Sequence, residues 1–130
     1  MSAAHELALY LATEGVGAFG GSGDWGLHVS REPFAPDNVI TLYDTGGGPA
    51  PNYNLQLREP TIQVRTRSIS YASGFAKQES IFALLNAIKT QQISGRSYIG
   101  VWIIGEILSI GRDDNDRHLL TANYRIQRGT

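Results

Sequence analysis

The segment Thr61–Ser68 constrains the fold most, because it alternates strictly between two kinds of residue. Its even-numbered positions from 62 to 66 are Ile, Val and Thr, and its odd-numbered positions from 63 to 67 are Gln, Arg and Arg. A period of two predicts a β-strand with one face in the core and the other in solvent or on a partner. Leu119–Arg128 alternates in the same way, with Tyr124 and Ile126 on its core side, so a second such strand is expected near the end of the chain.

Between these two strands the period changes. Apolar residues recur at i, i+3, i+4 and i+7 from Ile81 to Ile88, which predicts a helix from Ser73 to about Gln92 that packs on the sheet. Leucines one turn apart predict a shorter amphipathic helix over residues 3–13.

Three further segments are predicted to be strands: Trp25–Ser30, Val39–Tyr43, and Tyr98–Ile110 with a bend or bulge at Gly105-Glu106. The short GRDDND segment after the third is typical of a hairpin turn. The order helix, strands, helix, strands indicates an α+β class: a mostly antiparallel or mixed sheet of four to six strands with two helices packed on it. We expect one domain over residues 1–130.

Glycine-rich segments at 15–24 and 45–54 are predicted to be flexible. The first, GVGAFGGSGDW, contains the spacing G-x-G-x-x-G of a dinucleotide-binding loop. Such a loop follows a strand and opens a helix, whereas this one follows a predicted helix and precedes a predicted strand. We therefore interpret it as a connector that lets the N-terminal helix swing towards a neighbouring subunit or the tube.

The remaining motifs do not support catalysis, a cofactor or a metal. TGGGPAPN, from Thr45, lacks the Lys-Ser/Thr and the following helix of a phosphate loop. GRDDNDRH lacks the glycine and glutamate of a calcium-binding EF-hand. The three histidines have no metal-like spacing, and no G-x-S-x-G motif is present. A small nucleotide-binding or hydrolytic enzyme is the most distant alternative.

Composition narrows the range of partners. Eleven Lys and Arg against twelve Asp and Glu give a net charge of −1, so no overall basic field attracts nucleic acid. No cysteine is present, and no apolar run approaches the roughly 20 residues of a membrane-spanning helix. We expect a protein that is made in the cytoplasm and does not contact a membrane.

Polar residues of two predicted strands form the most suggestive set. Arg65 and Arg67 share one strand face, and Arg125 and Gln127 lie on the polar side of the last strand. If these strands are neighbours, their face suits carboxylates of another subunit or phosphate. The alternative interpretation is an ordinary solvated sheet face.

Three segments carry a family resemblance: TLYDTGG from Thr41, EPTIQVRTRS from Glu59, and RHLLTANYRI from Arg117. Their order and spacing over Val39–Arg128 resemble the minor capsid proteins of tailed bacteriophages that are similar to lambda-type tail terminators. The resemblance implies a structural virion protein of the tail or neck, assembled in the bacterial host cytoplasm, with no catalytic activity.

The resemblance also implies partners and contact residues. The subunit would form a homo-hexameric ring that caps the tail tube, ends its polymerisation and joins the head–tail connector or stopper protein, with DNA as a further contact in the ring. A different neck protein, such as a head-closure or connector component, is the nearer alternative. The implied interface residues are in the loop after the second strand, in the third strand and in the last: Tyr43, Asp44, Gly46, Gly47, Gly48, Gln63, Arg65, Arg67, Asn123 and Arg125.

Overall fold

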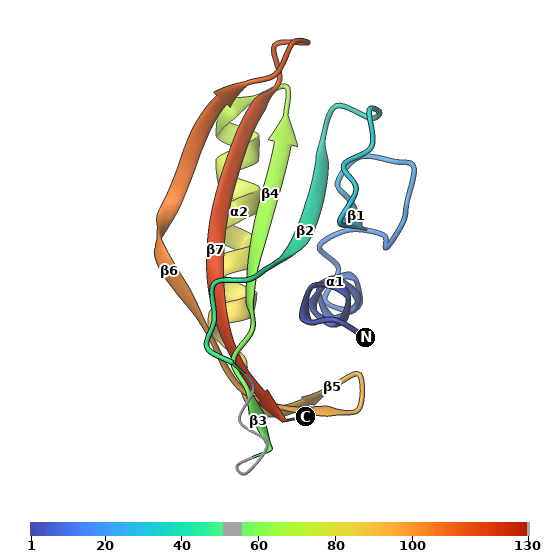
Figure 1. Cartoon of the computed structure of the whole chain (residues 1–130). Helices are drawn as coiled ribbons and strands as arrows, with labels where there is room; N and C mark the ends of the chain where they lie inside the picture. The colour runs from blue at the N-terminus through green and yellow to red at the C-terminus, as the bar shows by residue number, and fades with distance from the viewer. Residues whose placement is uncertain (51–55, 130) are drawn as a thin grey trace.

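The computed structural model describes residues 1–50 and 56–129, which form two helices and seven strands (Figure 1). In chain order these elements are α1 (Ala3–Thr13), β1 (Gly26–Val29), β2 (Val39–Thr45), β3 (Leu57–Arg58), β4 (Thr61–Ser68), α2 (Tyr71–Asn86), β5 (Lys89–Ile93), β6 (Arg96–Arg112) and β7 (His118–Gly129).

The strands form one sheet in the order β1-β2-β4-β7-β6-β5, and the short β3 pairs with the end of β7. β1 and β2 are parallel and all other pairs are antiparallel. The predicted α+β class and mixed sheet are confirmed. The sheet has seven strands where four to six were predicted, because the short β3 and β5 have no alternating pattern to reveal them.

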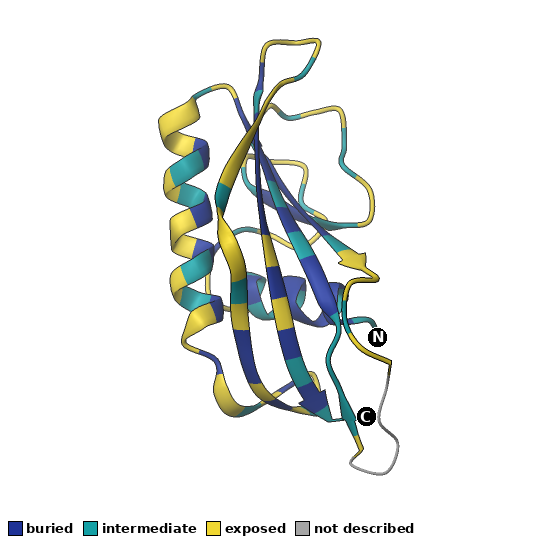
Figure 2. Cartoon of the chain, turned by 60° about the vertical axis from the view of Figure 1, so that its left-hand side comes forward, coloured by how far each residue is buried: buried dark blue, intermediate teal, exposed yellow. Residues whose placement is uncertain are grey.

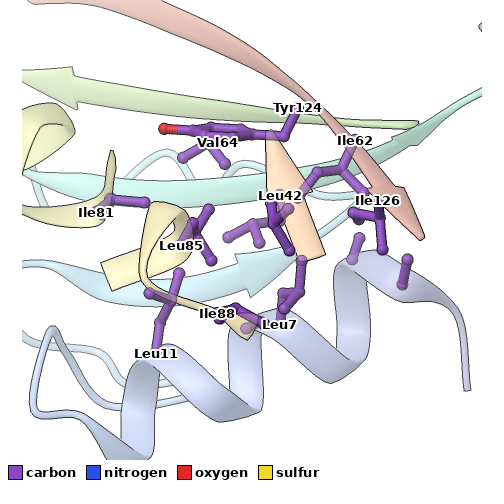
Figure 3. Close-up of a cluster of buried hydrophobic side chains, with 14 of the residues drawn as sticks. Leu7, Leu11, Leu42, Ile62, Val64, Ile81, Leu85, Ile88, Tyr124 and Ile126 are labelled. Carbon is purple, nitrogen blue, oxygen red and sulfur yellow. The ribbon is translucent and has the colours of Figure 1, made fainter. Parts of the chain in front are cut away.

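Both helices cover the same side of the sheet, α1 against β1, β2, β4 and β5, and α2 against β4, β6 and β7. The core between helices and sheet includes Leu7 and Leu11 of α1, Leu85 of α2 and Leu42 of β2 (Figure 3). Tyr124 and Ile126 of β7 are fully buried, as predicted. The opposite side of the sheet carries no helix and is called the uncovered face below.

The helix α1 begins and ends where the leucine spacing predicts. Ser2 is its N-cap and accepts a hydrogen bond from the His5 backbone N–H at 3.2 Å, and Asp44 Oδ1 accepts one from the Ala4 N–H at 3.0 Å. Leu7 and Leu11 have no exposed surface. The helix is therefore fixed both at its start and along its buried side.

The predicted helix 73–92 is wrong at its C-terminal end. α2 stops at Asn86, and Lys89–Ile93 pairs with β6 as the strand β5. Ser94 and Gly95 connect these strands with φ of +51° and +79°, as a tight hairpin turn requires. Ile88 is buried as the helical pattern predicted, but it lies in the turn after the helix, so pairing with β6 overrides the local periodicity.

The glycine-rich connector at 15–24 is not a free hinge. Gly20 N donates to the Leu27 carbonyl at 2.7 Å, Leu27 N donates to the Ala18 carbonyl at 2.9 Å, and Lys77 Nζ lies 3.3 Å from the Val16 carbonyl. These bonds attach the connector to the outer edge of β1 and to α2. In the isolated chain α1 packs on its own sheet through this anchored connector, so the structure gives no support to the expected swing of the N-terminal helix. In the second glycine-rich segment, residues 51–54 lie outside the described residues.

The bulge predicted at Gly105-Glu106 is confirmed. Ile104 pairs with Asn123 and Leu108 with Thr121, so the register shifts between them, and Gly105 has a φ of +77°. The two extra residues shift the pairing of β6 with β7 and keep Ile104 and Leu108 on the same face.

Candidate assembly surfaces

Strand register brings half of the predicted contact residues together on the uncovered face. Tyr43 pairs with Gln63 and Gln63 with Asn123, so these three side chains form a row across β2, β4 and β7. Arg65 and Arg125 lie on the same face of the adjoining strands. The strands that carry these arginines, β4 and β7, are neighbours, which was the condition for a shared polar face.

The side chains of Arg65 and Arg125 already make contacts with other residues of the same chain. Arg65 Nε lies 3.0 Å from Glu32 Oε2, and the Arg125 guanidinium lies 5.0 Å from the centre of the Trp102 ring. Burial, and then the charge of Glu32, raises the pKa of Tyr43, so its hydroxyl is neutral at pH 7. The surface is polar and hydrogen-bonding, and it is not a bare cationic patch.

Arg67 lies on the same strand face as Arg65, but it is buried and is therefore not part of the exposed row. It is only 2% exposed, and its guanidinium contacts the Glu32 carboxylate and donates to the carbonyl oxygens of Phe34, Pro36 and Asp37. Burial, and then the nearby Arg117, lowers the pKa of Arg67. Arg67 therefore holds the segment before β2 in place beneath the surface.

The predicted loop residues divide between β2 and the loop that follows it. Tyr43 and Asp44, which the resemblance placed in the loop, belong to β2, because that strand continues to Thr45 through pairing with β4. Tyr43 also agrees with the strand predicted at Val39–Tyr43, whereas Asp44 lies on the helix side, where it caps α1. Gly46–Gly48 do lie in the loop, where Gly47 N donates to Thr61 Oγ1 at 3.0 Å. A Cβ at Gly48 would overlap the Glu59 carbonyl oxygen, so this loop runs closely along the start of β4.

Sequence reasoning missed a band of exposed apolar side chains on β6. Half of the exposed large hydrophobic residues in the described chain lie on this one strand: Ile99, Trp102, Ile104, Leu108 and Ile110. β5 pairs with β6 only as far as Gly100, and among the described strands none pairs with the outer edge beyond it. Figure 2 shows β6 exposed along much of its length beside the mainly buried β4 and β7. The sequence did carry a signal for this band. The strand predicted at Tyr98–Ile110 does not alternate between apolar and polar residues, which indicates apolar side chains on both of its faces.

A hollow of about 440 Å³ lies on the other side of β6, between this strand and α2. Four apolar side chains and two carboxylates line it: Phe75, Phe82, Ile103, Ile107, Glu79 and Glu106. We call it the α2–β6 groove. The sequence analysis named none of these residues, because only the packing of α2 beside β6 brings them together.

The described residues contain no cluster of metal-ligand side chains. Within residues 1–50 and 56–129, no three His, Cys, Asp or Glu side chains gather as metal ligands would. Burial, and then the charge of Arg67, lowers the pKa of His28, which keeps this imidazole neutral at pH 7. Neither described helix has the length and apolar character needed to cross a membrane.

Comparison with known protein families identifies the family to which the chain belongs. The family described as "Bacteriophage tail terminator protein" matches residues 10–129. The chain belongs to this family. It is thus a structural protein of a bacteriophage tail and a component of the virion, and the predicted resemblance is confirmed.

Solved structures support the fold of this tail terminator family member. Among the matches is a chain from "Virion of native gene transfer agent (GTA) particle", with a TM-score of 0.61 and 12% identity over 79% of this chain and 78% of that one. At this identity the likeness is one of fold. The curated proteins contain no significant match.

Proposed function

We propose that this protein forms a homo-hexameric ring that caps the tail tube, ends its polymerisation and joins the tail to the head connector or stopper protein. The family supports a place at the end of the tail. The observation that carries the proposal is the apolar band on β6 beside the polar row of the uncovered face. Assembly takes place in the host cytoplasm before the tail meets the head.

The uncovered face has the composition of a protein interface. Exposed apolar side chains gathered on one strand indicate a contact site, and aromatic residues and arginine are enriched in such sites. Trp102, Ile104 and Leu108 provide the apolar part, while Arg65 and Arg125 provide hydrogen-bond donors. We assign this face, with Gly46–Gly48 at its border, to the tail tube.

The ring would also surround the DNA that passes from head to tail. A net charge of −1 leaves no overall basic field, so such a contact depends on local side chains and stays weak. Weak contact suits a channel through which DNA must move.

Purified protein and tail-tube protein test the proposal directly. Sedimentation velocity should show a six-subunit species, and electron microscopy should show tubes that stop growing when the protein is added. The double variant Trp102→Ala/Arg125→Glu should keep its fold but lose tube capping, while Asp114→Ala in the exposed β6–β7 turn serves as the control. A protein that stays monomeric, does not bind tubes and does not limit their length would contradict the proposal.

Phage particles assembled without this protein would distinguish a tail terminator from a head-closure or connector component. A terminator leaves overlong tails, whereas a head-closure or connector component leaves unsealed heads. Overlong tails in negative-stain images are the expected result.

A further inference from the structure

Phe34 is displayed on the surface in an unusual way. Its side chain is 74% exposed, the highest value among the large hydrophobic residues of the described chain. It lies in the segment between β1 and β2, and it lines a surface hollow together with Arg31. No carboxylate lines that hollow, whereas Asp24 and Asp37 line a second hollow that Phe34 also borders. We call residues 31–34 the knob. Within it, Glu32 is paired with Arg65 and Arg67 of the same chain, so Arg31 is the charged residue free to face a partner.

Two buried arginines hold the backbone of the knob. Arg67 Nη2 and Arg117 Nη1 both donate to the Phe34 carbonyl oxygen, at 3.1 and 2.6 Å, and these arginines are 2% and 4% exposed. The Arg117 guanidinium also lies 5.1 Å from the centre of the Phe34 ring. An exposed aromatic residue that is fixed before binding loses little conformational entropy when it binds, which favours affinity.

The α2–β6 groove is complementary to this knob. Its apolar lining of Phe75, Phe82, Ile103 and Ile107 is half-buried and can accept an aromatic side chain. Glu79 and Glu106 at the groove are exposed and negatively charged, while Arg31 on the knob is exposed and positively charged. Aromatic anchors in apolar pockets supply most of the energy of an interface, and opposite charges set its orientation.

The knob and the groove cannot meet within one chain. The knob precedes β2 and the groove borders β6, and β4 and β7 lie between these strands in the sheet (Figure 1). A contact between them therefore joins two copies through different patches, which is the heterologous arrangement that closes into a ring when the rotation between copies permits.

We infer that Phe34 of one copy inserts into the α2–β6 groove of the next, with Arg31 facing Glu79 and Glu106, and that this is the contact between subunits of the ring. The inference rests on the proposed ring and names the surfaces that build it. The uncovered face then stays free for the tail tube.

The first test measures self-association of the protein alone by sedimentation velocity. Phe34→Ala removes the anchor and should weaken association by about 30-fold or more, as for a central aromatic residue of an interface. Glu14→Ala is the control, because Glu14 is exposed at the end of α1 and belongs to neither the knob, the groove nor the apolar band on β6, and it should change association less than about threefold. Urea unfolding of each variant establishes that the fold is intact.

Charge reversal tests the orientation independently of the anchor. Arg31→Glu alone, or Glu79→Lys with Glu106→Lys, should weaken association by about tenfold, because like charges then face each other. Combining all three substitutions in one chain should restore association to within about threefold of the wild type. Restoration is expected because every contact in a ring contains one knob and one groove.

The outcomes separate this inference from the proposed function. A wild-type ring that persists unchanged in Phe34→Ala and in the charge variants overturns the inference and leaves the ring standing. A Phe34→Ala ring that forms normally but no longer caps tubes assigns Phe34 to the tube and also overturns it. If the wild type assembles only on tube ends, the same variants are scored there by cross-linking between subunits, and unchanged cross-linking has the same meaning. A wild type that neither assembles nor caps tubes contradicts the proposed function itself.

Discussion

At the residue scale, Gly17 explains why the first glycine-rich segment looks like a nucleotide loop. A Cβ at this position would overlap the carbonyl oxygen of Trp25, so the backbone passes too close to the next part of the connector for any side chain. The glycine permits close packing of the connector along β1, where Phe19 forms an isolated bridge with Leu27. Its physical role is in the fold of the subunit.

Gly17→Ala should therefore lower the free energy of unfolding by about 1–3 kcal/mol, because the added methyl group forces the backbone apart. Gly23→Ala in the same segment is the control, since its Cβ would meet no atom within 4 Å and its φ is not positive. Urea unfolding followed by circular dichroism measures both variants. Equal stability of the two would contradict the close approach at Gly17.

At the element scale, β6 presents apolar side chains on both of its faces. Ile103 and Ile107 face the α2–β6 groove, while Ile104 and Leu108 lie on the opposite face and are exposed. The bulge adds two residues to β6, because four steps from Ile104 to Leu108 lie opposite two steps from Asn123 to Thr121. An even number of extra residues leaves the alternation of faces unchanged and shifts only the pairing with β7.

Gly105→Ala tests the backbone of this bulge. The site is open, with nothing within 4 Å of the added Cβ, so the cost comes from the φ of +77° alone and should be about 1–2 kcal/mol of stability. Gly46→Ala is the control, because that site is equally open and has no positive φ, and it should be neutral or slightly stabilising. Thermal unfolding reports the difference, and a Gly105→Ala protein as stable as Gly46→Ala would show that the bulge is not strained by an L-residue.

At the scale of the whole molecule, a buried ionic cluster joins the two ends of the chain. Glu6 of α1 is 1% exposed and accepts hydrogen bonds from the Tyr98 hydroxyl at 2.6 Å, from Arg96 Nε at 2.9 Å and from Arg128 Nη1. Burial, and then the hydrogen bond to Glu6, raises the pKa of Tyr98, so the phenol remains a donor. The first helix and the last strand are thereby held as one unit.

Glu6→Ala should destabilise the protein by about 3–5 kcal/mol, because it leaves the buried Arg128 without its counter-charge. Amide hydrogen exchange should also quicken in α1 and β7 together, since both contact the cluster. Glu14→Ala, at the exposed C-cap of the same helix, should change stability by less than about 0.5 kcal/mol. Equal effects of the two substitutions would show that the cluster does not link the chain ends.

The polar part of the candidate site could be predicted because it follows from strand periodicity. Gln63, Arg65, Asn123 and Arg125 alternate with core residues, so their common face was readable in each strand. The periodicity could not separate Arg65 from Arg67, because burial of Arg67 depends on the segment before β2 folding over it. The family resemblance added the class of protein, which periodicity cannot supply.

Local patterns by themselves determined the class of the fold, the bounds of α1 and β4, and the core positions Tyr124 and Ile126, because helical and strand periods are properties of neighbouring residues. Only the tertiary structure decided the end of α2, the anchoring of the glycine-rich connector and the meeting of α2 with β6 in a groove. These features depend on contacts between residues far apart in the chain, where strand pairing and burial outweigh local preference.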